Sequence, residues 1–213
     1  MTPLQQRWFA QLQQHQAIAI IRTADWQQGV KMAAIAIAGG LHLIEITWNS
    51  DQAGRIIETL REKFPSALIG AGTILTPADL KEAIASGASF AFSPHSDRDL
   101  VKVAHLRDVP MVLGALTPSE IYQAWRWGSD GVKVFPIKAV GGTAFIHCLR
   151  PALAEIPLIP TGGVTLKNAP EFIQAGAIAV GLSSDLFPET MVQRAEWPQL
   201  TQRIRRHHPS QWS

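Results

Sequence analysis

The sequence has 213 residues but a single cysteine, Cys148, so no disulfide can form within the chain. This absence argues against a disulfide-stabilised secreted domain and favours a reducing compartment. Cys148 lies in FIHCLR, a stretch typical of a helix. We expect it to pack in the core rather than to act as a nucleophile.

Long apolar runs and blocks of like charge are also missing. No run approaches the roughly 18–20 apolar residues that a membrane span needs, and the N-terminus lacks the basic region and apolar core of a signal peptide. The formal net charge is +2, and the charges are scattered, which gives no sign of nucleic-acid or membrane binding. We therefore expect a cytoplasmic protein. The one basic run, RIRRHH at 203–208, is interpreted as part of a flexible tail over 203–213.

The sequence does not indicate a metal or a dinucleotide site. Its histidines show no metal-ligand spacing beyond the adjacent pair His207 and His208, so we expect no metal. The stretch GAGTIL at 70–75 places Leu75 where a dinucleotide fingerprint has its third glycine. That departure argues against a Rossmann-type site.

One pattern does recur along the chain: a helical stretch, a small residue with a glycine, and a short apolar run that ends in polar or turn residues. It occurs as AIAGGLHLIEIT, AIASGASFAFSP, AWRWGSDGVKVFP and FIQAGAIAVGLSS. We expect the glycines Gly39, Gly87, Gly128 and Gly176 to end the preceding helices in the left-handed conformation. With the runs between them, eight apolar runs end near residues 22, 47, 72, 93, 114, 135, 161 and 181.

The spacing of these runs predicts the fold. Consecutive ends lie 20 to 26 residues apart, which leaves room for one strand, one helix and two short loops, and such repetition implies parallel strands. Eight units close into a (β/α)₈ barrel, predicted as one domain over 1–213. A doubly wound sheet is the alternative, but nothing in the spacing marks a topological switch. Leu4, Trp8 and Leu12 predict an amphipathic lead-in helix over 1–16.

Two charged residues lie inside predicted strands, Glu45 in HLIEIT and Lys133 in GVKVF. Strand alternation places Thr47 on the face of Glu45 and Phe135 on the face of Lys133. If both faces point inward, an acid and an amine share the barrel interior. A structural ion pair is one interpretation, although apolar replacements of such pairs are often neutral or stabilising. The other is a Schiff-base lysine, because a desolvated amine can attack a carbonyl with a carboxyl as general acid and base.

Two glycine-rich turns follow the seventh and eighth predicted strands, PTGGVT at 160–165 and VGLSSDLF at 180–187. Backbone N–H groups at such turns hold phosphate or carboxylate, and phosphate sites recur at this place in barrels. The glycines could instead serve only to permit tight turns, but the serine or threonine in both turns favours an anion site. Chemistry in such barrels sits at strand ends, where the remaining polar residues are Arg22, Thr73, Ser93 with Pro94, and His95.

Together these motifs resemble those of the KHG/KDPG aldolases, also called 2-keto-3-deoxy-6-phosphogluconate aldolases, over nearly the whole chain. The matching stretches are IEIT, GAGTILTP, FAFSP, VKVFP followed by GG, PTGGV and VGLSS, in that order. The resemblance implies a homotrimeric class I aldolase that needs no metal or cofactor. It also implies reversible cleavage of 2-keto-3-deoxy-6-phosphogluconate to pyruvate and glyceraldehyde 3-phosphate. A second implied substrate is 4-hydroxy-2-oxoglutarate, which gives pyruvate and glyoxylate.

The resemblance further implies roles for single residues. Lys133 is the Schiff-base nucleophile and Glu45 the general acid and base in this assignment. Contacts to the small-molecule substrate fall to Arg22, Thr47, Asn49, Thr73, Pro94, Phe135 and Thr161, and contacts to its phosphate to Gly162, Gly163, Ser183 and Ser184.

Three positions depart from the family pattern. Asn49 stands where the family usually has an arginine that binds the keto-acid carboxylate. An amide cannot form that bidentate pair, so Arg22 would have to compensate. His95 and Ser183 each replace a usual glycine, and we expect an altered substrate preference. Two alternatives stay open: an isomerase or synthase that binds phosphate without imine chemistry, and an inactive relative that binds a sugar phosphate or keto acid.

Overall fold

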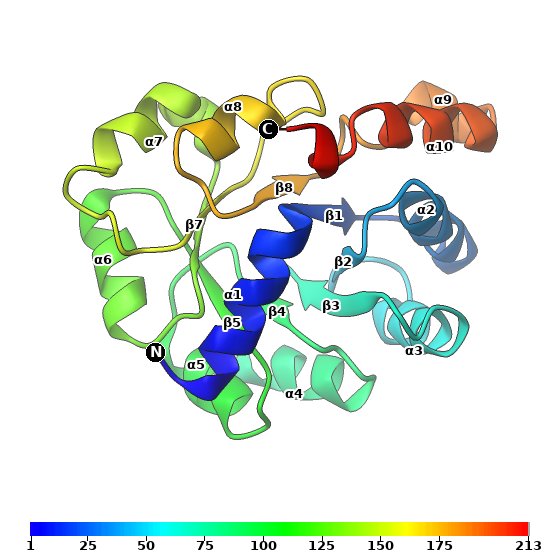
Figure 1. Ribbon diagram of the computed structural model, residues 1–213. Coiled ribbons are helices and arrows are strands. Elements are labelled where there is room, and N and C mark those ends of the chain that lie inside the picture. Colours follow the sequence, from blue (N-terminus) through cyan, green and yellow to red (C-terminus); the bar gives the residue numbers. More distant parts are fainter. Residues whose placement is uncertain (213) are drawn as a thin grey trace.

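The computed structural model describes residues 1–212 as a barrel of parallel strands surrounded by helices (Figure 1). The eight-stranded sheet has the order β7-β6-β5-β4-β3-β2-β1-β8. A parallel bridge between Thr161 and Gly181 brings the two end strands together. The (β/α)₈ barrel predicted from the sequence is therefore confirmed.

The strand ends lie within one residue of the predicted ends. The strands are β1 (Ala17–Ile21), β2 (Leu43–Thr47), β3 (Leu68–Gly72), β4 (Ala91–Phe92), β5 (Met111–Ala115), β6 (Val132–Val134), β7 (Leu158–Pro160) and β8 (Val180–Leu182). The helices are α1 (Pro3–His15), α2 (Trp26–Ala38), α3 (Ala53–Lys63), α4 (Pro77–Ala85), α5 (Arg98–His105), α6 (Pro118–Arg126), α7 (Thr143–Leu149), α8 (Ala169–Gln174), α9 (Glu189–Gln193) and α10 (Trp197–Arg206), with 3-10 turns η1 (Ile137–Val140) and η2 (Pro209–Gln211).

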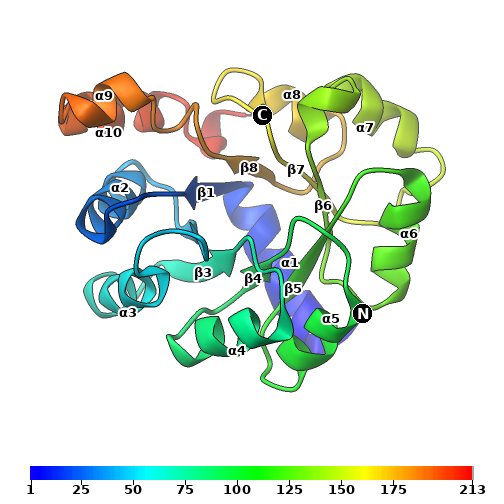
Figure 2. The same ribbon diagram turned by 180° about the vertical axis from the view of Figure 1, so that it is seen from behind.

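Helix α1 covers one end of the barrel, the end where the strands begin. It crosses in front of the strands in Figure 1 and behind them in Figure 2. Trp8 and Leu12 are buried in a cluster with inward-facing residues of the strands, and the ring of Trp8 lies 5.0 Å from that of Phe90. This position explains the apolar spacing of the helix. Its apolar face closes the barrel at the N-terminal ends of the strands, opposite to their C-terminal ends.

Inside the barrel, small residues on one strand make room for large residues on the next. A Cβ on Gly70 would lie 2.4 Å from the ring of Phe90, and a Cβ on Gly181 would lie 2.5 Å from Thr161 Oγ1. Neither glycine has a positive φ. Their role is therefore to leave space rather than to supply backbone freedom.

The C-terminal segment differs from the flexible tail expected over 203–213. Residues 203–206 form the last turn of α10, where Ile204 is fully buried, and Trp212 is 5% exposed. Arg203 Nη2 lies 2.9 Å from Asp185 Oδ2. The prediction was wrong because it followed the basic composition of this segment and overlooked its apolar residues, which have the spacing of a packed helix face. Residue 213 lies outside the described residues.

Two smaller expectations also need correction. After α2, the residue in the left-handed conformation is Gly40, with φ 102°, and not Gly39 as expected. Gly39 still has helical φ and ψ. Gly87, Gly128 and Gly176 have positive φ as expected. Cys148 lies on α7 as expected but is exposed rather than packed in the core.

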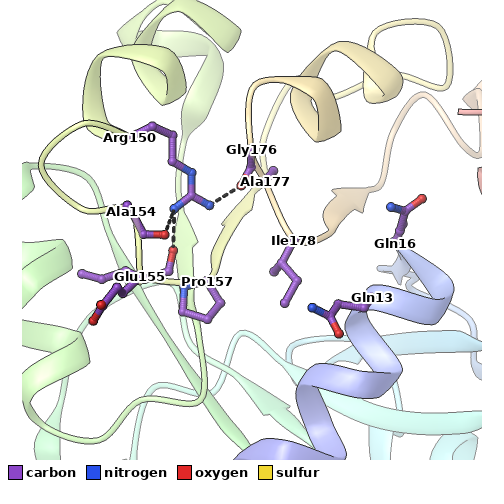
Figure 3. Close-up of a pocket in the computed structure, with 10 residues that line it drawn as sticks. Gln13, Gln16, Arg150, Ala154, Glu155, Pro157, Gly176, Ala177 and Ile178 are labelled. Atoms are coloured by element: carbon purple, nitrogen blue, oxygen red, sulfur yellow. Dashed lines mark hydrogen bonds between the residues drawn. The ribbon is translucent and has the colours of Figure 1, made fainter. Parts of the chain in front are cut away.

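A cavity of about 350 Å³ lies at the N-terminal end of the strands, beside the end of α1. The side chain of Arg150 lines it (Figure 3). The guanidinium donates to the carbonyl oxygens of Leu153, Ala154 and Ile156 at 3.0 to 3.1 Å, and also to that of Gly176. These bonds tie the loop after α7 to the end of α8. Arg150 in this cavity therefore has a structural role, and we assign no ligand to the cavity.

Within residues 1–212, no helix is long and apolar enough to cross a membrane.

Candidate active site

A second cavity, of about 460 Å³, lies at the C-terminal ends of the strands. It is lined by every site residue expected from the sequence except Asn49. These are Arg22, Glu45, Thr47, Thr73, Pro94, Lys133, Phe135, Thr161, Gly162, Gly163, Ser183 and Ser184.

Asn49 is exposed in the turn after β2 and does not line this cavity. Three lining residues were missed, Ile20, Val164 and Gly181. Ile20 and Gly181 carry no polar signal, yet strand alternation could have found them, because each stands two positions before an expected residue. Nothing in the sequence singles out Val164.

Glu45 projects into the cavity from β2 and is only 1% exposed. Neither of its carboxylate oxygens has a hydrogen-bond partner among residues 1–212. Burial raises the pKa of Glu45, and the nearby charges of Lys133 and Arg22 oppose that rise in part. An acid with a raised pKa and no hydrogen-bond partner among residues 1–212 is suited to general acid and base catalysis.

Space for the Glu45 side chain comes from Gly72, on the neighbouring strand β3. A Cβ on Gly72 would lie 1.7 Å from Glu45 Oε1 and 2.3 Å from Glu45 Cδ. Any side chain at position 72 would therefore displace the carboxyl group.

Lys133 enters the cavity from β6 and is 5% exposed. Its Nζ lies 5.2 Å from the ring centroid of Phe135 and 6.0 Å from that of Phe92. No salt bridge joins Lys133 to Glu45 in the part of the chain that the structure describes. The direct structural ion pair weighed as an interpretation of the sequence is therefore not formed. The amine and the acid instead both line one cavity.

Replacing Glu45 with glutamine is expected to stabilise the fold by roughly 1–3 kcal/mol at pH 8. A carboxyl whose folded pKa is raised stabilises the protein below its unfolded pKa, and this contribution is lost as pH rises through the folded pKa. The advantage of Glu45→Gln should therefore grow between pH 5 and pH 8. Urea unfolding of both proteins at the two pH values measures it. An advantage that is equal at both pH values would show that ionisation of the buried carboxyl is not its cause.

Arg22 and Thr73 lie at the mouth of the cavity. Arg22 Nη2 is 3.4 Å from Thr73 Oγ1, and Thr73 has a φ of 56°. A left-handed conformation in a β-branched residue costs of order 1–3 kcal/mol and is found most often at functional sites. Arg22 is exposed, so its guanidinium has donors to offer to an anionic ligand.

The turns after β7 and β8 also line the cavity. Gly162 and Gly163 have φ values of 88° and 92°, and a Cβ on Gly163 would lie 2.5 Å from Lys138 Cβ. Both glycines are thus required by conformation, and the second also by space. Ser183 and Ser184 lie beside them in the lining. Backbone N–H groups in successive positive-φ conformations make a concave anion-binding surface.

His95 does not line this cavity. It lines an adjoining one of about 640 Å³, which shares Pro94 and Phe135 with the first. Its Nδ1 lies 3.0 Å from Ser93 Oγ. His95 is therefore held beside the cavity that contains Glu45 and Lys133 rather than inside it.

Among residues 1–212, no three His, Cys, Asp or Glu side chains are grouped so that they could hold a metal ion.

Comparison with known proteins gives one consistent result. The family model of KDPG and KHG aldolase matches residues 9–203. The 2-dehydro-3-deoxy-phosphogluconate aldolase of Pseudomonas aeruginosa is 33% identical over 183 residues, which cover 86% of this chain and 82% of the relative. The KHG/KDPG aldolase of Escherichia coli K12 is 28% identical over 188 residues, 88% of each chain.

Solved structures agree with this result. The KDPG aldolase of Legionella pneumophila was captured with pyruvate as a covalent carbinolamine intermediate, and it superimposes with a TM-score of 0.86. Its sequence is 28% identical, and the superposition covers 94% of this chain and 97% of that one.

Proposed function

The chain belongs to the KDPG and KHG aldolase family, and from this premise we propose that it cleaves 2-keto-3-deoxy-6-phosphogluconate reversibly to pyruvate and glyceraldehyde 3-phosphate. The enzyme is an aldolase, a lyase. The observation that carries the proposal is the shared cavity, which is lined by a buried amine, Lys133, and by a buried acid, Glu45, whose oxygens have no hydrogen-bond partner among residues 1–212. Such a pair fits imine chemistry better than isomerisation without an imine.

The proposed chemistry begins at Lys133. Its amine adds to the keto carbon, and Glu45 supplies the proton that lets the carbinolamine lose water, which leaves a protonated imine. Glu45, now ionised, removes the proton of the C4 hydroxyl while the C3–C4 bond breaks. The electron pair of that bond moves into the protonated imine to give a neutral enamine, and glyceraldehyde 3-phosphate leaves as the aldehyde. Protonation of the enamine and hydrolysis release pyruvate and restore the free amine. A raised pKa suits Glu45 to both directions of proton transfer.

The two ends of the substrate are assigned to different residues of the cavity lining. We assign the keto-acid carboxylate to Arg22 and Thr73, because Arg22 is the one guanidinium in the lining and Asn49 lies outside it. The phosphate is assigned to the turns with Gly162, Gly163 and the two serines 183 and 184. Thr161, Pro94 and Phe135 then flank the reacting carbons.

Reductive trapping tests the proposal directly. The protein is incubated with pyruvate and borohydride, and the modified peptide is identified by mass spectrometry. We expect a single adduct on Lys133, which becomes a stable secondary amine. A folded protein that gives no adduct at saturating pyruvate would overturn imine chemistry. An isomerase or an inactive binding relative would then be the better assignment.

Substrate choice is a separate measurement. Turnover of 2-keto-3-deoxy-6-phosphogluconate, of its galactonate analogue and of 4-hydroxy-2-oxoglutarate is compared on the same protein. We expect the phosphorylated substrates to have the lower KM, because only they use the turns after β7 and β8.

The resemblance to the family also supports a homotrimer, which light scattering can measure. The single cysteine supports a cytoplasmic location.

A further inference from the structure

Ser50 joins the loops that follow β1 and β2. Its side chain is 8% exposed, and its Oγ accepts a hydrogen bond from the backbone N–H of Thr23 at 3.2 Å. The same Oγ lies 3.0 Å from Oγ1 of Thr47. The N–H of Asp51 donates to the carbonyl of Thr23 at 3.0 Å. The turn after β2 is thereby fastened to the end of β1.

Hydroxyl protons can be assigned in this cluster. Either oxygen of the Thr47–Ser50 pair could be the donor on distance alone. Ser50 Oγ already accepts the Thr23 N–H, and within residues 1–212 its one remaining hydrogen-bond partner is Thr47 Oγ1. Whichever hydroxyl donates, the other hydroxyl proton has no acceptor within residues 1–212, and such a buried proton is costly. Thr47 lines the cavity and Ser50 does not, so a ligand in the cavity can accept the proton of Thr47 but not that of Ser50. The arrangement that a bound ligand favours is therefore the one in which Ser50 donates to Thr47 and the proton of Thr47 points to the ligand.

In that arrangement the proton of Thr47 has no acceptor among residues 1–212. Thr47 is 1% exposed and lines the cavity beside Glu45. In the described range, 1–212, Ser50 is the one side-chain partner of Thr47 Oγ1, and the oxygens of Glu45 have none. The Thr47 hydroxyl is thus a buried donor that a ligand in the cavity can satisfy.

We propose that Ser50 is a positioning residue, which orients the Thr47 hydroxyl as a hydrogen-bond donor to the keto-acid part of the bound substrate. The proposal rests on the aldolase function proposed above. It assigns Ser50, which does not touch the substrate, a role in substrate binding through Thr47. The keto-acid part is the match because the register of β2 and β3 pairs Thr47 with Gly72, the residue next to Thr73, to which the carboxylate is assigned.

A double-mutant cycle with Ser50→Ala and Thr47→Val tests this role, read by kcat/KM for 2-keto-3-deoxy-6-phosphogluconate. Each single variant is expected to lose about 3- to 10-fold in kcat/KM, the effect of one neutral hydrogen bond. The double variant should be no slower than Thr47→Val, because Ser50 acts only through the hydroxyl that Thr47→Val removes. The concentration of pyruvate that gives half-maximal borohydride adduct should follow the same pattern.

Unfolding by urea separates positioning from a merely structural role. Ser50→Ala also deprives the Thr23 N–H of its acceptor, so it should lower stability equally with threonine or valine at position 47. Ser50→Thr keeps the hydroxyl and is expected to recover most of the lost kcat/KM. Activity losses that multiply in the double variant would overturn the proposal, as would a Ser50→Thr variant that is folded yet as slow as Ser50→Ala. A wild-type protein without a pyruvate adduct would instead overturn the aldolase function, and this role with it.

Discussion

Turnover should fall by roughly 10⁴-fold or more when Lys133 is replaced with methionine, because the covalent route through an imine is then closed. Methionine has a similar length and no charge, and it can pack against the rings of Phe135 and Phe92 that face Nζ. Cleavage is followed by coupling the release of pyruvate to lactate dehydrogenase.

The folded state of Lys133→Met is expected to survive. The variant removes a buried amine from an apolar strand, and the positive charge that lowers the pKa of Glu45 goes with it. That carboxyl then stays neutral to higher pH, so no unpaired charge is left behind. The melting temperature should therefore be equal to that of the wild type or higher.

Lys81→Met is the matched control, because Lys81 is exposed on α4. It should turn over at the wild-type rate and still form the pyruvate adduct. Residual activity in Lys133→Met within tenfold of the wild type would mean that another group does the chemistry. An adduct on a different lysine would identify that group.

How far the sequence predicts this molecule can be judged from particular residues. The strand ends followed from spacing because each βα unit of a closed barrel needs a similar length of chain. Alternation alone placed Thr47 on the face of Glu45 and Phe135 on the face of Lys133, and the structure shows that all four line the cavity. Both are local or periodic properties, which a single sequence carries.

Other features depend on contacts between distant segments. Asn49 follows β2 and was expected in the site, but the turn that carries it is fixed by the bond between Ser50 and Thr23, 27 positions away in the chain. Alternation no longer applies once the strand ends at Thr47. The packing of the last helix, with Ile204 against Gly39, is non-local in the same way. No single stretch of the sequence contains this information.

Gly72 is the sharpest case of a role that only the structure assigns. The motif GAGTIL was considered only as a possible dinucleotide fingerprint, whereas the register of β2 and β3 pairs Glu45 with Gly70 and Thr47 with Gly72. Gly72 thus stands diagonally across from Glu45, and its φ is not positive. An alanine is compatible with the backbone at this position but not with the carboxyl that already occupies the space.

Gly72→Ala is therefore expected to lower kcat by about 10²- to 10⁴-fold, the range for loss of a general acid and base. The new methyl group must displace the Glu45 carboxyl from its place in the cavity that it shares with Lys133. Overpacking in the interior should also cost roughly 1–3 kcal/mol of stability. Rates are measured per folded molecule, with the folded fraction taken from urea unfolding of the same sample.

Gly70→Ala is the control for overpacking, since its methyl group meets the ring of Phe90 at 2.4 Å instead of Glu45. It should lose similar stability but keep kcat within a few-fold. The double variant Gly72→Ala with Glu45→Asp completes the test, because the shorter acid withdraws from the added methyl group. We expect it to be faster than Gly72→Ala alone, a gain that two independent lesions cannot produce. Equal losses of kcat in Gly70→Ala and Gly72→Ala would show that general disruption, and not displacement of Glu45, limits the rate.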